Sequence, residues 1–84
     1  MDAAMIGKIE KAMQYSQEPD RISFQSFQAT FKGDHTAHTV SYENGQWTCD
    51  CSFASVRGVC SHIMTVERRL AGSVEHAEVL PTPA

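Results

Sequence analysis

The sequence contains no long apolar run, and no charged stretch followed by an apolar segment near its first residue. The first absence argues against a membrane-spanning helix, which needs about 20 apolar residues. The second argues against a secretory signal peptide. We therefore expect a cytoplasmic protein with no membrane partner, in a reducing compartment where clustered cysteines bind metal more often than they form disulfides.

Basic residues are also scarce. Seven Lys and Arg stand against ten Asp and Glu, which gives a formal net charge of -3. Residues 33–84 carry six acidic side chains and only three basic ones, Arg57, Arg68 and Arg69. This balance disfavours a polyphosphate ligand, which usually requires a basic patch. A local patch made by the three arginines stays open as a DNA-binding surface.

Cysteine is rare, and its number is odd. Three cysteines cannot all pair in disulfides. They form, with one histidine, the segments Cys49-Asp50-Cys51 and Cys60-Ser61-His62, which eight residues separate. Four sulfur and nitrogen ligands are what a tetrahedral structural zinc site needs. The sequence therefore predicts one Zn²⁺ ion, which would help a chain too short to bury a large core.

Apolar residues near the beginning of the chain recur at helical spacing. Asp2 is a candidate N-cap, and the pattern predicts a helix from about Asp2 to Ser16. The segment Glu18-Pro19-Asp20 ends it. We expect the stripe that these apolar residues form on the helix to contact the core of the domain rather than a partner. The stripe consists of Met5, Ile6, Ile9, Ala12 and Met13.

Three strands follow in the prediction, over residues 21–32, 36–42 and 47–51. In the first strand, the apolar residues change from even to odd positions near Gln25-Ser26. This change indicates either a bulge or a strand that is covered by other residues on both faces. Asn44-Gly45 suits the positive φ angles of a tight hairpin turn between the second and third strands. His38, Val40 and Tyr42 share one face of the second strand.

The rest of the pattern predicts a loop over 52–59 and a helix from about Ser61 to Ala71, with Gly72 as its C-cap. The fold class is therefore α+β, with an N-terminal helix, a three-stranded antiparallel sheet and a C-terminal helix. We expect one domain over 1–72, made of the N-terminal helix (1–18), the first strand (21–35) and a zinc finger (36–71). Residues 73–84 are expected to be a flexible tail in which Val79-Leu80 is a candidate docking point.

Strand and helix geometry place the four ligands around one ion. Cys49 and Cys51 have the same parity and face the same side of a strand. Cys60 and His62 stand at the beginning of a helix, where free backbone N–H groups favour a thiolate. The ion would join the hairpin to the helix. All four positions are filled by protein, so we expect a structural site and no enzyme.

Additional metal ligands and a redox role for the thiols are less well supported by the sequence than a structural zinc site. His35 and His38 lie three apart in a strand and point to opposite faces, so exposed polar positions are expected for both. Asp50 has the parity that turns it away from the ion. A thiol redox or metal-transfer role for Cys49 and Cys51 would need exposed thiols of low pKa, and saturation of the zinc by His62 argues against it.

The ligand segments resemble those of the SWIM-type zinc finger, a ββα zinc fold. The resemblance rests on Trp47-Thr48-Cys49-Asp50-Cys51 and on Gly58-Val59-Cys60-Ser61-His62-Ile63-Met64, and it covers roughly residues 36–70. It implies that Cys49, Cys51, Cys60 and His62 bind zinc. It also implies a module that binds DNA or protein partners.

The expected function is thus a zinc-binding interaction module, with protein slightly favoured over DNA because of the net charge. Arg57, Arg68, Arg69 and Phe53 are the candidate partner-binding residues. Trp47 is expected to pack beneath the zinc site instead. A homo-oligomer is compatible with the sequence, and an edge of the aromatic-rich first strand is a surface that a protein could use.

Overall fold

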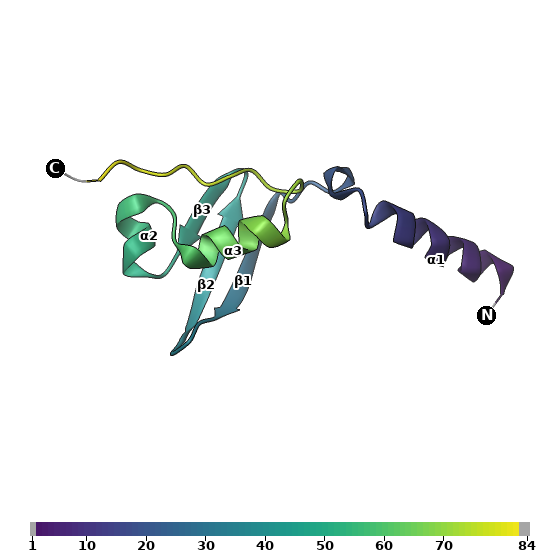
Figure 1. Ribbon diagram of the computed structural model, residues 1–84, viewed down its shortest axis with the longest axis horizontal. Coiled ribbons are helices and arrows are strands. Elements are labelled where there is room, and N and C mark those ends of the chain that lie inside the picture. Colours follow the sequence, from purple (N-terminus) through teal and green to yellow (C-terminus); the bar gives the residue numbers. More distant parts are fainter. Residues whose placement is uncertain (1, 83–84) are drawn as a thin grey trace.

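The computed structural model describes residues 2–82, and it confirms the α+β class. A three-stranded antiparallel sheet lies behind helix α3, helix α2 stands at one end, and helix α1 projects from the other (Figure 1). The elements in chain order are α1 (Ala3–Tyr15), a 3₁₀ turn η1 (Pro19–Arg21), β1 (Ser26–Lys32), β2 (Ala37–Glu43), β3 (Gln46–Cys49), α2 (Ser52–Arg57) and α3 (Ser61–Arg69).

The sheet has the order β1-β2-β3, so both connections are hairpins. The second turn is the predicted one. Asn44 and Gly45 have φ angles of 46° and 91°, and two successive positive φ values match the twist of the flanking strands. The turn sets the register in which Trp47 faces Tyr42 and Cys49 faces Val40.

The core lies between the sheet and α3. Val40 and Ile63 are fully buried, and Tyr42 and Trp47 nearly so. Phe27 stacks on Tyr42 with ring centroids 5.3 Å apart. Trp47 is buried, as expected, and its ring meets Tyr42 edge-on at 4.7 Å. This small aromatic cluster holds the hairpin that carries the first metal ligands.

The first strand begins later than predicted. Residues 19–21 form the 3₁₀ turn, and β1 starts only at Ser26. The Phe24 N–H donates to the Ser73 carbonyl, 2.9 Å away, instead of to a strand. The parity change near Gln25-Ser26 therefore marks the point at which the chain enters the sheet, and the register of β1 against β2 runs without a bulge.

Helix α1 forms as predicted, but its apolar stripe does not reach the core. The Met5 N–H donates to Asp2 Oδ1 at 2.8 Å, which confirms the N-cap. No residue of α1 is buried. The helix extends away from the sheet (Figure 1), along a molecule that measures 62 × 26 × 16 Å. The expected contact with the core is wrong, because periodicity shows which face is apolar but not what covers it.

The predicted loop over 52–59 is also corrected. It contains helix α2, which ends in the left-handed Gly58 (φ 76°). Helix α3 stops at Arg69, with Leu70 as its C-cap, and Gly72 takes a positive φ two residues later. The expected extension of this helix to Ala71 with a Gly72 cap is therefore about two residues too long.

Residues 73–82, expected as a flexible tail, instead run along the domain (Figure 1). The Trp47 indole N–H donates to the Glu75 carbonyl at 2.7 Å, and the Glu75 N–H donates to the Tyr42 hydroxyl at 3.1 Å. The Leu80 N–H donates to the Arg57 carbonyl at 2.8 Å. The backbone of this segment therefore bonds to the domain. The contact of Leu80 lies at the docking point expected near Val79-Leu80. The last two residues of the predicted tail, 83 and 84, lie outside the described part.

Candidate metal centre

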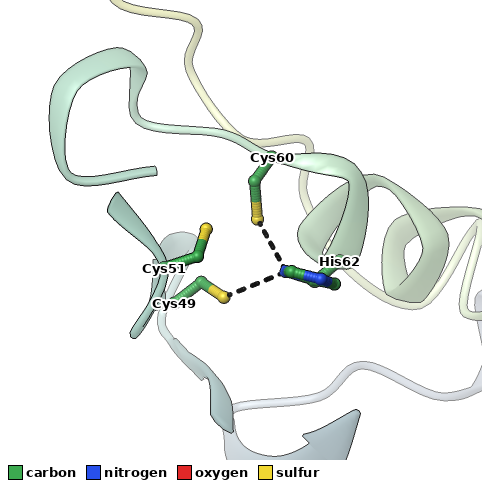
Figure 2. Close-up of side chains that lie close together, drawn as sticks. All are labelled: Cys49, Cys51, Cys60 and His62. Carbon is green, nitrogen blue, oxygen red and sulfur yellow. Dashed lines mark hydrogen bonds between the residues drawn. The ribbon is translucent and has the colours of Figure 1, made fainter. Parts of the chain in front are cut away.

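The four predicted ligands converge from three elements (Figure 2). Cys49 is the last residue of β3, and Cys51 precedes α2 as its N-cap. Cys60 is the N-cap of α3, where its sulfur accepts the Ile63 N–H at 3.5 Å, and His62 lies in the first turn of that helix. The predicted position of Cys60 and His62 at a helix start is confirmed. Cys51 has left the strand, because α2 begins beside it.

The distances fit one zinc ion. Nδ1 of His62 lies 3.6 Å from the sulfur of Cys49 and 3.7 Å from that of Cys60, the contacts drawn as dashed lines in Figure 2. A tetrahedral ion with Zn–S of about 2.3 Å and Zn–N of about 2.0 Å separates the two ligand atoms by about 3.6 Å. All four donor atoms lie within 4.8 Å of one another. The set is arranged to bind one zinc ion, and Nδ1 is the His62 nitrogen that would coordinate it.

Without metal, the first two thiols differ in acidity. Burial is the main reason that the pKa of Cys49 rises to about 12, and the neighbouring thiols add to it. Burial also acts to raise the pKa of Cys51. Backbone N–H groups at the start of α2, first that of Ala54, and the Cys60 and Cys49 side chains outweigh it, so the pKa of Cys51 is lowered. The ion must displace a firmly held proton from Cys49, so zinc binding releases protons.

A second layer of side chains supports His62. The His38 ring stacks on the His62 ring, with centroids 4.2 Å apart and an angle of 24°, and Phe31 contacts it at 4.8 Å. His38 Nδ1 lies 2.9 Å from Asp50 Oδ1, and the other Asp50 oxygen accepts the Thr39 N–H at 3.2 Å. The hydrogen bond to His38 is the main reason that the pKa of Asp50 is lowered.

This second layer was missed by the sequence analysis. His38 is not an exposed strand residue, because its side chain is only 21 % exposed. Its parity, shared with the buried Val40 and Tyr42, was the signal that could have found it. Asp50 does turn away from the ion, as expected, and it does so toward His38. Two residues that precede the first ligand, Phe31 and His38, thus pack against His62, and Asp50 holds His38 in place.

The four candidate partner residues do not form one surface. Phe53 is 57 % exposed and lines a surface pocket of about 460 Å³ together with Cys51 and His62. Arg57 is half-buried at the end of α2, where its Nε donates to the Leu80 carbonyl at 2.9 Å. Arg68 and Arg69 are exposed at the far end of α3, which is roughly 13 Å long for its nine residues.

No helix among residues 2–82 has both the length and the apolar character that a membrane span requires.

Comparison with known proteins identifies the segment that carries the ligands. No curated protein and no solved structure matches the chain. The family model of the SWIM zinc finger matches residues 38–71. That range begins at His38 and includes Cys49, Cys51, Cys60 and His62. The ligand geometry and the family match agree: residues 38–71 match the SWIM zinc finger and bring its four ligands together.

Proposed function

We propose that the chain is a zinc-stabilised module that binds a protein partner through helix α1. One observation carries the proposal. Four large apolar side chains on one face of α1, hereafter the α1 stripe, are 40–63 % exposed. An exposed apolar stripe on a helix is typical of an interaction site, in which the helix lies in a groove of its partner. The α1 stripe consists of Met5, Ile6, Ile9 and Met13.

The joint between α1 and the domain supports this role. The Arg21 guanidinium lies over the Tyr15 ring, 4.3 Å from its centroid, and pairs with Glu18 at 3.0 Å. On the other side of the joint, Ser73 Oγ donates to the Pro19 carbonyl. These contacts tie the end of α1 to η1, and η1 to the zinc domain, so the helix is held away from the sheet.

The geometry favours protein over DNA and binding over catalysis. Arg57 already donates to the tail, and α3 separates it from Arg68 and Arg69, so the three arginines make a poor phosphate-binding patch. The four protein ligands leave no position on the ion for a substrate, whereas catalytic zinc keeps one open. We therefore infer a non-enzymatic protein that works in a reducing, cytoplasmic compartment.

The test compares stripe and control variants in a capture experiment. The zinc-loaded protein is used as bait in a lysate of its source organism, beside Ile6→Glu/Ile9→Glu and a control, Lys8→Gln/Lys11→Gln, which changes only the polar face of α1. A protein that the wild type and the control retain, and that the stripe variant loses, is the expected result. Equal retention by all three would contradict the proposal.

The DNA alternative is tested by a salt titration. We expect no binding to duplex or single-stranded DNA at low salt. Tight binding that weakens steeply as salt rises would overturn the preference for protein. The redox alternative predicts rapid thiol labelling of the zinc-loaded protein, which a closed site resists.

A further inference from the structure

Strand β1 forms one edge of the sheet. It pairs with β2 on one side. Among residues 2–82, no strand pairs with its other side. The other edge is different, because β3 has only four residues and ends at the metal centre. The free side of β1 is therefore the longest unpaired edge of this sheet.

Two backbone hydrogen bonds show which groups point outward. The Gly33 N–H donates to Thr36, and the Asn44 N–H donates to Gln25. They lie at the two ends of the β1–β2 ladder, in which hydrogen-bonded pairs alternate with non-hydrogen-bonded ones. Residues 27, 29 and 31 therefore bond to β2. The backbone groups of Ser26, Gln28, Thr30 and Lys32 point to the free side.

This edge lacks the usual protection against pairing. Natural edge strands carry proline, a bulge or a central charge, or they are very short. β1 is seven residues long, is regular in its register with β2, and has the sequence SFQATFK. Its one charge, Lys32, is at the end. Such an edge is open to a further strand.

We propose that β1 pairs antiparallel with β1 of a second copy of this chain, around a two-fold axis at Ala29. In this register, Gln28 faces Thr30 of the second copy, and Ser26 faces Lys32 of the second copy. These are the residues whose backbone groups point outward, so every one of them finds a partner. The result is a continuous six-stranded sheet.

The side chains explain why the partner is a second copy. Ala29 meets its counterpart in a non-hydrogen-bonded pair, where the Cα atoms approach to about 4.5 Å and a small side chain is suited. On the same face, Phe27 lies opposite Phe31 of the second copy, an aromatic cross-strand pair that stabilises a sheet. No like charges face each other, because Lys32 stands opposite a serine. The strand is thus complementary to itself.

The two surfaces are distinct, so this inference goes beyond the proposed function. The β1 edge lies in the sheet, and the α1 stripe lies on a helix outside it (Figure 1). If the test of the β1 dimer fails, the proposal of a partner site on the α1 stripe still stands, and the reverse also holds.

The test measures the mass of the full, zinc-loaded chain by analytical ultracentrifugation from micromolar to millimolar concentration. We expect the mass to rise toward twice the 9.3 kDa of one chain. Thr30→Pro removes an outward N–H and leaves the ladder with β2 intact, as proline on an edge strand does. It should weaken the dimer at least about tenfold, since both copies lose a hydrogen bond. Thr30→Ala keeps the N–H and should still dimerise.

Two further measurements make the result decisive. One zinc per chain in Thr30→Pro would show that the variant is folded. Amide hydrogen exchange of the wild type should slow at high concentration for Gln28 and Thr30 and stay unchanged for exposed amides elsewhere. A monomer at every concentration would overturn the proposal. So would a dimer that Thr30→Pro leaves intact, or one that Ile6→Glu/Ile9→Glu abolishes.

Discussion

At the scale of single residues, His38 and Asp50 support the metal centre although they are not in its ligand set. His38 covers one side of the His62 ring, and Asp50 fixes His38 through a contact of 2.9 Å. Groups in the second layer orient the ligands and commonly change metal affinity when they are removed. The hydrogen bond joins the two residues, so we expect a change in one to affect the position of the other.

We predict that Asp50→Ala weakens zinc binding by about tenfold. The substitution frees His38 and the Thr39 N–H, so the His62 ring is less well oriented before the ion arrives. Competition against a chromogenic chelator measures the change. Asp34→Asn is the matched control, since it removes an exposed carboxylate in the turn between β1 and β2. Equal affinities for the wild type and Asp50→Ala would show that the contact between Asp50 and His38 has no role in zinc binding.

A second prediction concerns Gly58, which ends α2 in a left-handed conformation and lies against the C-terminal segment. Its φ is 76°, and a Cβ atom there would lie 2.8 Å from the Glu78 carbonyl oxygen. Gly58→Ala should therefore lower the free energy of unfolding by about 1–2 kcal/mol, from the left-handed backbone alone. Urea unfolding of the zinc-loaded protein measures it. Gly7→Ala, which has open space around it inside helix α1, should not lower this value, because alanine favours a helix over glycine. An unaffected Gly58→Ala protein would contradict both the left-handed conformation of Gly58 and the close approach of the tail.

At the scale of elements, the segment after α3 completes the domain. Its Glu75 carbonyl accepts the hydrogen bond of the Trp47 indole N–H. Its Ala77 N–H donates to the carboxylate of the nearly buried Glu67 at 2.5 Å. The segment has no regular secondary structure, so its order depends on these contacts with the sheet and the helix.

Removal of residues 75–84 should lower the free energy of unfolding by roughly 3–5 kcal/mol, because five hydrogen bonds of about 0.5–1 kcal/mol each are lost. Urea unfolding followed by circular dichroism measures the difference. A shorter truncation, of residues 82–84 only, spares all of these contacts and serves as the control. The same stability in both truncated proteins would mean that the segment contributes nothing.

Much of the metal centre was predictable from the sequence because its determinants are local. The Asn44-Gly45 turn, the parity of Cys49 and the helix start at Cys60 depend on neighbours in the chain. Helix α2 was not predictable in this way. Its six residues are too few for a periodic pattern, and it depends on its position between Cys51 and Gly58.

The remaining differences come from tertiary contacts. The beginning of β1 depends on the bond between Phe24 and Ser73, which are far apart in the sequence. The burial of His38 depends on α3, which brings His62 against it. An apolar stripe such as that of α1 has the same sequence pattern whether it meets its own core or another protein.

At the scale of the whole molecule, the core is small and the ion connects its two layers. Val40 and Ile63 are the only fully buried large side chains among the described residues. The ligands come from the sheet end and from α3, whose mutual contacts are otherwise few. Small domains of this kind are folded with metal and unfolded without it.

We predict that a strong chelator unfolds the zinc domain and that added Zn²⁺ restores it. Metal binding contributes an apparent free energy on the order of 10 kcal/mol in small zinc domains, which exceeds the stability that so small a core supplies. Amide chemical-shift dispersion measures the loss and its recovery. Cys60→Ser should behave like the chelated protein. A well-dispersed spectrum in the absence of metal would refute the structural role of the ion.

The position of Trp47 has an optical consequence. It is the single tryptophan of the chain, it is 8 % exposed, and it lies two residues before the first ligand. Its indole also bonds to Glu75, in the segment that closes the domain. Loss of the ion and release of this segment both admit water to the ring, so the wavelength of its emission maximum reports on both. The native protein therefore carries its own fluorescent sensor of zinc occupancy, with no label required.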